Sequence, residues 1–151
     1  MTHLIHRRFM NEALTLADKA ASNGEVPVGA VVVADNTIIS SSFNLRESQQ
    51  DPTAHAELLA LREAAKVLKN WRLTDCTVYV TLEPCAMCAG AMVLARIKHC
   101  VFGCADPKGG FTGSLADLSR WPGLNHHFEV TGGILEEECR ERLQRFFRSR
   151  R

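Results

Sequence analysis

The chain has 151 residues, 46% of them hydrophobic, which is the usual size of one domain with ample material for a packed core. Its 18 Lys and Arg nearly balance its 17 Asp and Glu, so bulk charge argues neither for nor against a nucleic-acid partner. The polar N-terminal segment is unlike a signal peptide and no run of about 18 apolar residues occurs, so we expect a cytoplasmic protein without a membrane partner.

The first third of the chain predicts a helix followed by a β-hairpin. Apolar residues recur at three- and four-residue intervals over 6–22, as on one face of an amphipathic helix. The next stretch predicts hairpin arms over 28–33 and 37–42, because Asp35 and Asn36 between them favour a tight turn.

The rest of the chain alternates helices with strands. The expected elements are a helix over about 53–68, a strand over 77–82, a helix from Pro84 to about 95, strands over 99–103 and 127–131, and a closing helix over 135–148. This order predicts an α/β fold, with helices on both faces of a mixed sheet. Because no repeat, low-complexity tract or linker interrupts it, we expect a single domain over residues 1–151.

Two short motifs carry the residues with chemical potential. The first, PTAHAELLAL at 52–61, contains His55 and Glu57, and the second, TLEPCAMCAG at 81–90, contains Cys85 and Cys88. The two cysteines are three apart in a first helical turn, where the free backbone N–H groups and the helix dipole favour the thiolate that binds zinc. With the imidazole they make three ligands, which leaves the fourth position of a catalytic zinc for water. The glutamate is then placed to move protons.

Two other interpretations of the cysteines remain open at this point. A thioredoxin-like redox pair would also follow a strand and open a helix, but redox chemistry gives no role to His55 or Glu57. A closed structural zinc site would need a fourth ligand, and the four other cysteines lack paired ligand spacing: Cys76, Cys100, Cys104 and Cys139. The combination H-x-E with P-C-x-x-C downstream favours a catalytic site, since it is the signature of zinc nucleobase deaminases, the tRNA enzymes among them.

Beyond these motifs, the chain closely resembles the bacterial tRNA-specific adenosine deaminases of the TadA type, within the cytidine-deaminase superfamily. The resemblance covers nearly the whole length and rests on EVPVGAVVV, NLRE, DPTAHAE, YVTLEPCAMCAGAM, ADPKGG, GSL and FFRSRR. It implies a three-layer α/β/α sandwich with a mixed five-stranded sheet, the cytidine-deaminase-like fold. It also implies one zinc ion (Zn2+) per subunit, a homodimer, and conversion of the wobble adenosine of a tRNA anticodon to inosine.

The resemblance gives each motif residue a role. His55, Cys85 and Cys88 match the zinc ligands of the family and Glu57 its proton shuttle. In the implied mechanism zinc hydroxide attacks C6 of adenine, Glu57 moves protons to N1 and to the amino group, and ammonia leaves. Because Glu57 already fills the acid/base role, we interpret Glu83 as a structural carboxylate at the entry of the following helix.

Further positions match residues of the family that lie near the substrate. Asn44 matches a residue that contacts the base, and Val26 and Ala56 match positions that line its pocket. The loop that carries Asp106 and Lys108 lies near the RNA in the family. We therefore expect these five residues to bind the anticodon stem-loop.

The C-terminal segment RERLQRFFRSRR, residues 140–151, contains six arginines and only one acidic residue, Glu141. Arginines interleaved with aromatics are typical of a surface that follows a nucleic-acid backbone, so we expect Phe147 and Arg148 to help hold the RNA. In the alternative interpretation the arginines only stabilise the helix end, and Phe146 and Phe147 face the core.

Three functions therefore compete. The first is the RNA-editing deaminase, the second a deaminase of free nucleobases or nucleosides, and the third a zinc-stabilised RNA-binding module without catalysis. Glu57 argues against the third, because a structural module needs no unliganded carboxylate beside its metal. Asn44, the DPKGG loop and the C-terminal arginines favour RNA over a free nucleoside. One departure from the family pattern is Cys104, where a small residue without a thiol is more usual.

Overall fold

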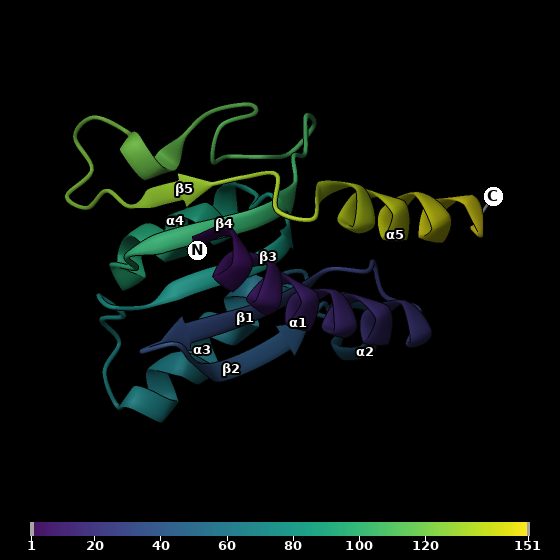
Figure 1. Ribbon diagram of the computed structural model, residues 1–151, viewed down its shortest axis with the longest axis horizontal. Coiled ribbons are helices and arrows are strands. Elements are labelled where there is room, and N and C mark those ends of the chain that lie inside the picture. Colours follow the sequence, from purple (N-terminus) through teal and green to yellow (C-terminus); the bar gives the residue numbers. More distant parts are fainter. Residues whose placement is uncertain (1, 151) are drawn as a thin grey trace.

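The computed structural model describes residues 2–150, and Figure 1 shows its helices and strands. In chain order they are α1 (Thr2–Ser22), β1 (Gly29–Ala34), β2 (Thr37–Phe43), α2 (Arg46–Gln49), α3 (Ala56–Leu68), β3 (Thr77–Leu82), α4 (Ala86–Ala95), β4 (His99–Cys104), the 3-10 helix η1 (Leu118–Arg120), β5 (Glu129–Thr131) and α5 (Glu136–Arg148). Every predicted helix and strand is present. The hydrophobic pattern does not predict α2 and η1, because helices of three or four residues are too short to show periodicity.

The boundaries differ from those predicted by up to four residues. The largest shift is at α1, which begins before the apolar stripe that faces the core; Leu4 and Ile5, in its first turns, are exposed. Helix α3 begins at Ala56, later than predicted, because the Asp51 carboxylate accepts hydrogen bonds from the backbone N–H and hydroxyl of Thr53. That turn keeps His55 in an extended conformation outside the helix.

The five strands form one mixed sheet in the order β2-β1-β3-β4-β5. Strand β1 is antiparallel to both of its neighbours, and β3, β4 and β5 are parallel to one another. The hairpin turns at Asp35 and Asn36, whose φ values of 56° and 57° are the positive values that a tight two-residue turn requires. The mixed five-stranded sheet is therefore confirmed.

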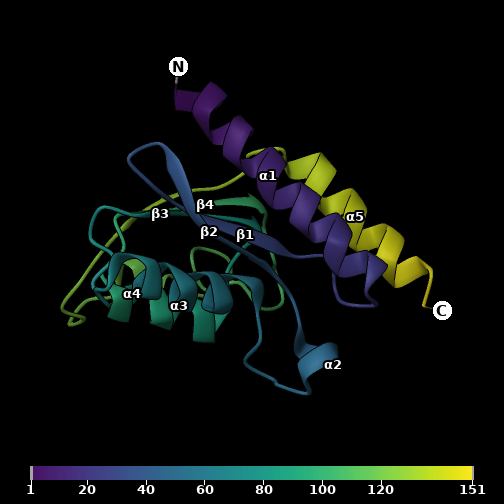
Figure 2. The same ribbon diagram turned by 90° about the horizontal axis from the view of Figure 1, so that it is seen from below.

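Helices cover both faces of this sheet, and Figure 2 shows the three layers. Helices α1 and α5 lie side by side on one face, and α3 and α4 cover the other. Successive side chains of β3 point to opposite faces of the sheet, so this strand contributes to the core on each face. Val78 and Val80 pack on the side of α3 and α4, and Tyr79 packs beneath α1. This arrangement is the expected α/β/α sandwich.

Helices α3 and α4 both begin at one end of the sheet, which we call the motif end because both sequence motifs lie there. Strand β3 leads through Glu83 and Pro84 into α4, and α3, which packs beside α4, starts directly after His55. His55 and Cys85 are the residues that precede the first turns of these helices, and both have extended backbone. Within residues 2–150, no helix has both the length and the apolar character needed to cross a membrane.

Candidate active site and metal centre

The motif end of the sheet brings together His55, Cys85 and Cys88. The His55 Nδ1 atom lies 3.7 Å from the Sγ atoms of both cysteines. In a tetrahedral zinc site with Zn–N near 2.0 Å and Zn–S near 2.3 Å, ligand nitrogen and sulfur atoms lie about 3.5 Å apart. The three side chains therefore already have the spacing that one zinc ion requires. Cys88 is fully buried and the other two are half-buried, so the cluster is open on one side.

The protonation of this cluster also suits a cation. The hydrogen bond with Cys88 and the nearby His55 lower the pKa of Cys85 to about 3. The hydrogen bond with Cys85, together with burial, raises the pKa of Cys88, and the bond with Cys85 raises that of His55. These pKa shifts favour a Cys85 thiolate, next to Cys88 and His55 in their protonated forms. A metal ion would take the place of those protons, as thiolate and imidazole ligands require.

Glu57 lies in the first turn of α3, next to this cluster but outside it. Among the described residues, the group with metal-ligand spacing consists of His55, Cys85 and Cys88 alone. The Glu57 side chain is 4% exposed, and burial raises its pKa to about 7. A carboxyl group with a pKa near the working pH can both accept and donate a proton. Position and pKa both suit a proton shuttle better than a fourth ligand.

Asn44 fixes the start of α3 from the end of strand β2. Its side-chain oxygen accepts a hydrogen bond of 2.8 Å from the backbone N–H of Ala56. Because a backbone N–H can only donate, this contact identifies the oxygen and leaves the amide nitrogen as the group that could donate to a base. Ala56 itself is fully buried in the core cluster beneath α3.

The other predicted substrate residues surround one cavity of about 840 Å³ between the loop after β4 and the second half of α5. Five of its lining residues are the predicted ones: Val26, Asp106, Lys108, Phe147 and Arg148. Leu82 also lines it, and three residues of extended chain span at most about 11 Å, so the cavity lies at the same end of the sheet as Cys85, although none of the three candidate ligands lines it. Val26 and Arg148, which are 148 − 26 = 122 positions apart in the chain, thus meet at one surface. Cys104 is buried in its wall.

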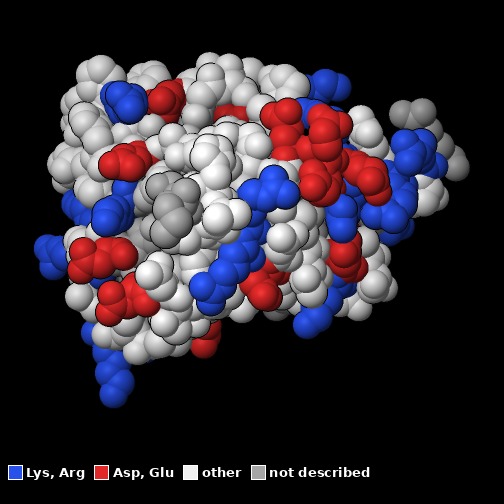
Figure 3. All heavy atoms as spheres, viewed as in Figure 1, with Lys and Arg blue, Asp and Glu red and all other residues white. Residues whose placement is uncertain are grey.

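The basic patch predicted for 140–151 is smaller than its arginine count suggests. Figure 3 shows the acidic and basic groups of α5 side by side on one face. The neighbouring contacts are Arg140 with Glu136 and Glu137, Arg142 with Asp18, Arg145 with Glu141, and Arg150 with the Gly24 carbonyl and the Phe146 ring. Arg148 has no ion pair with the described residues and lines the cavity. Arg151 lies outside the described residues.

Two buried carboxylates hold the loops on either side of the site. Glu25 accepts hydrogen bonds from the backbone N–H groups of Glu47 and Ser48 and from the Ser48 hydroxyl, which fixes α2 close to Asn44. Glu83 accepts four hydrogen bonds from residues 106–114. Its structural role agrees with the sequence interpretation, but its partners lie in that distant loop. Sequence reasoning misses Glu25 altogether, because a lone glutamate after Asn-Gly looks like an ordinary surface residue.

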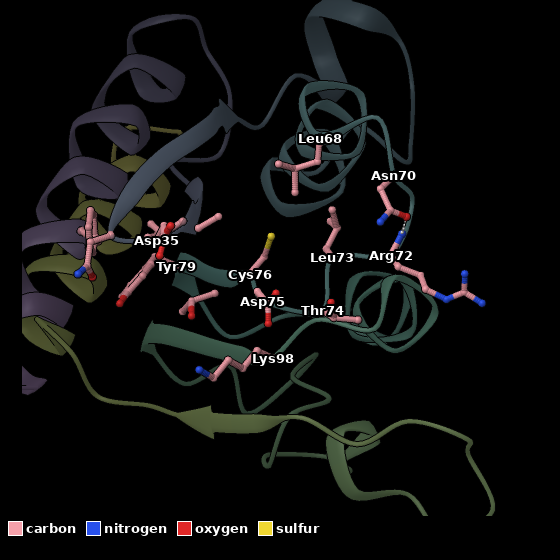
Figure 4. Close-up of a pocket in the computed structure, with 15 residues that line it drawn as sticks. Asp35, Leu68, Asn70, Arg72, Leu73, Thr74, Asp75, Cys76, Tyr79 and Lys98 are labelled. Atoms are coloured by element: carbon pink, nitrogen blue, oxygen red, sulfur yellow. Dashed lines mark hydrogen bonds between the residues drawn. The ribbon is translucent and has the colours of Figure 1, made fainter.

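A second cavity, of about 720 Å³, lies at the opposite end of the sheet, where β1 ends and β3 begins. Figure 4 shows its labelled charged residues, with Arg72 and Lys98 pointing in different directions. All four charged residues that line it are exposed: Asp35, Arg72, Asp75 and Lys98. No convergent set of polar groups marks this end as a second active site.

Comparison with known proteins agrees with the geometry at the motif end. The family model described as MafB19-like deaminase matches residues 5–151. The chain is 52% identical over 143 residues to a tRNA-specific adenosine deaminase of Bacillus subtilis, covering 95% of this chain and 89% of that protein.

Two solved structures give the same result at the level of the fold. One, from studies of A-to-I editing by tRNA:A34 deaminases at the wobble position of transfer RNA, has a TM-score of 0.87 and 42% identity, and covers 90% of this chain and 99% of that one. A guanine deaminase from Bacillus subtilis has a TM-score of 0.65 and 36% identity over 80% of each chain. Fold, cluster and relatives together confirm the resemblance found in the sequence: the chain belongs to the family of tRNA-specific adenosine deaminases.

Proposed function

We propose that this protein is a zinc-dependent hydrolase that converts the wobble adenosine of a tRNA anticodon to inosine. The observation that carries the proposal is the pairing of a three-ligand cluster, His55, Cys85 and Cys88, with a buried Glu57 that is not a ligand. A structural metal site needs no such carboxylate, whereas hydrolytic deamination needs a group that moves protons. The same pairing therefore argues against a non-catalytic RNA-binding module.

His55, Cys85 and Cys88 would hold the zinc. Zinc held there would bind a water molecule and lower its pKa to about 7, which would supply a nucleophile at neutral pH. Glu57 takes a proton as the water oxygen bonds to C6 of adenine, and delivers it to N1. The bond from C6 to the amino nitrogen then breaks, and Glu57 transfers the second proton of the water to that nitrogen, which leaves as ammonia.

The residues around the cluster would recognise the RNA. Asn44 would donate its amide nitrogen to the target base, and Val26 and Ala56 would border the base pocket. Phe147, half of whose surface is exposed, offers a face on which a neighbouring base can stack. Lys108 and Arg148 would bind phosphates at the same cavity, which Asp106 also lines.

A deaminase of free nucleobases is the main alternative, and the similarity to a guanine deaminase gives it weight. The metal and proton chemistry would be the same in both. The 840 Å³ cavity favours RNA, because it presents cationic and aromatic side chains at the same end of the sheet but outside the metal cluster, where nucleotides that flank the target base can bind. Binding energy from flanking nucleotides can position the reacting base there.

Three further properties belong to the proposal. Exposed apolar side chains on α4 and just after η1, Leu94 and Trp121 among them, support a homodimer, since α4 packs against η1. Six free cysteines support a reducing, cytoplasmic environment. A family match over residues 5–151 supports a single deaminase domain.

The test is deamination of an anticodon stem-loop by the zinc-loaded protein. One stem-loop carries adenosine at the wobble position, and a matched one carries guanosine there. We expect inosine in the nuclease digest of the first, with one ammonia released per inosine, and no change in the second. Absence of inosine from the first, with zinc bound, would contradict the proposed function.

A further inference from the structure

Glu83 is a buried carboxylate that the chemistry above does not use. It is 2% exposed and lies between strand β3 and the metal-ligand motif, two residues before Cys85. Its own backbone N–H donates to the carbonyl of Cys104, at the end of β4, over 2.9 Å. A buried charge is costly unless donors surround it, so the partners of this side chain indicate what it is for.

All four donors to Glu83 come from one loop, residues 106–114. Oxygen Oε1 accepts hydrogen bonds from the Asp106 N–H, at 3.0 Å, and from the Ser114 hydroxyl. Oxygen Oε2 accepts from the N–H groups of Thr112, at 3.2 Å, and Ser114, at 3.0 Å. The carboxylate thus ties the two ends of the loop to each other and to the segment that supplies Cys85.

The loop fits closely around this carboxylate. A Cβ atom built on Gly110 would overlap the Glu83 carboxyl group, so only glycine permits this approach. The Phe111 N–H also donates to the carbonyl of Pro84 over 2.8 Å. The loop therefore has little freedom to shift relative to Pro84 and Cys85 while these contacts hold.

Asp106, whose backbone N–H donates to Glu83, also organises the turn formed by residues 106–109, which we call the substrate-facing turn. The Asp106 side chain accepts hydrogen bonds of 3.1 Å from the N–H groups of both Lys108 and Gly109. Asp106 and Lys108 line the 840 Å³ cavity at the motif end of the sheet. A chain of hydrogen bonds thus runs from Glu83, two residues before the candidate ligand Cys85, through the N–H and then the side chain of Asp106, to the backbone of Lys108, the residue proposed to bind phosphate.

We propose that Glu83 is a positioning residue, which sets the distance between the metal centre and the Asp106–Lys108 turn and so places the nucleotides that flank the target base. The inference rests on the proposed function for its substrate, and on the hydrogen bonds above for its structure. It does not make Glu83 a catalytic residue, because the carboxylate faces the loop.

Glu83→Gln is the matched test because it preserves the shape of the side chain. A glutamine has one accepting oxygen and one donating nitrogen. If its oxygen keeps the Thr112 and Ser114 N–H groups, its nitrogen faces the Asp106 N–H, which can only donate. The Ser114 hydroxyl can turn to accept, but the Asp106 hydrogen bond is lost. The variant therefore releases the substrate-facing turn specifically.

We expect Glu83→Gln to keep its zinc and to raise KM for the stem-loop roughly 10-fold, the value of one lost charge-assisted hydrogen bond, with a smaller change in kcat. Amide hydrogen exchange at Asp106, followed by NMR, should become faster. In a double-mutant cycle with Lys108→Ala the effects on KM should be less than additive, because Lys108 binds only when the turn is in place. Glu12→Gln, an exposed change of the same charge on α1, should leave all these quantities unchanged.

Unchanged exchange at Asp106 and unchanged KM in Glu83→Gln would overturn the proposal, as would strict additivity with Lys108→Ala. If Glu83→Gln does not fold or loses zinc, Ser114→Ala and Gly110→Ala decide the question, since the first removes one donor and the second displaces the carboxylate without changing charge. Both should raise KM with faster exchange at Asp106, and normal values in both would contradict the proposal. Failure of the wild type to deaminate the stem-loop would refute the substrate alone, because the exchange measurement does not depend on it.

Discussion

The two ends of the central sheet carry cavities of similar volume, about 840 and 720 Å³, but they differ in whether charged side chains are buried. At the motif end three carboxylates are almost fully buried: Glu25, Glu57 and Glu83. At the opposite end every charged residue that lines the cavity is exposed. Since burying a charge is costly, the difference indicates where the molecule retains charge for chemistry and for holding loops.

The histidines at the two ends of the sheet also differ in the direction in which their pKa values are shifted. At the motif end, the hydrogen bond with Cys85 raises the pKa of His55, so that site attracts a proton or a cation. Towards the opposite end, His6 bonds to the Tyr79 hydroxyl over 2.8 Å and its ring lies 5.5 Å from that of His99. Burial lowers the pKa of both His6 and His99, so that pair excludes a proton. The cluster at the motif end thus favours a bound positive charge, whereas the buried pair of histidines disfavours one.

The largest effect should come from removing the proton shuttle. Glu57→Gln keeps the shape of the side chain but cannot move protons, so we expect kcat to fall roughly 10²- to 10⁴-fold. Zinc should stay at one ion per chain, because Glu57 lies outside the ligand cluster. Metal analysis and a rate assay on the same preparation check both. A variant that lost its zinc along with its activity would make Glu57 a ligand or a structural group.

A smaller effect is expected on the salt dependence of stem-loop binding, and it should distinguish the cavity at the motif end from the one at the opposite end. Replacing Arg148 by Ala should weaken stem-loop binding and reduce the slope of log affinity against log salt by roughly 0.7–0.9, the value of one phosphate contact. The single-turnover rate at saturating RNA should change little. Arg72→Ala, at the opposite end, is the matched control and should leave the slope unchanged. Equal slopes for wild type and Arg148→Ala would mean that Arg148 only stabilises the end of α5.

The smallest effect concerns the opposite end and pH. Because the folded state lowers the pKa of His6, the unfolded chain binds its proton more readily, and His6 contributes stability that is present above about pH 6.5 and lost as the pH falls. The groups that face it are His3, Tyr79 and His99, with Glu129 and Lys98 beyond. His6→Gln should reduce the loss of stability between pH 7.5 and 5.5.

Denaturant unfolding at both pH values, in saturating zinc, measures this difference between wild type and variant. The comparison cancels the titration of His55 and isolates His6. An equal loss of stability in the two proteins would mean that His6 does not exclude the proton.

Much of the fold and the metal site can be predicted from the sequence, because both depend on local patterns. Alternation and helical periodicity reveal the strands and long helices, and the combination of H-x-E with P-C-x-x-C, at His55, Glu57, Cys85 and Cys88, indicates a candidate zinc site. The contacts of Glu25 and Glu83 cannot be predicted in this way. Each depends on backbone N–H groups from a distant loop, and a backbone N–H leaves no mark in the sequence.

The arginines of α5 also show that a residue's partners in the fold are not given by the composition of its segment. Their number predicts a basic patch, yet Arg140 and Arg145 pair with glutamates of the same helix. The partner of Arg142, Asp18, is more than a hundred positions away and becomes visible only when α1 and α5 lie side by side. Counting charges along the chain therefore overestimates the patch, whereas the fold singles out Arg148.

The most direct test of the account compares kcat/KM for inosine formation from an anticodon stem-loop with kcat/KM for free adenosine and for free guanine, on one zinc-loaded preparation. The account predicts efficient turnover of the stem-loop and an efficiency on the free compounds that is lower by orders of magnitude, because flanking nucleotides position the base. Comparable efficiency on free adenosine or guanine would contradict it and identify a deaminase of free nucleosides or bases.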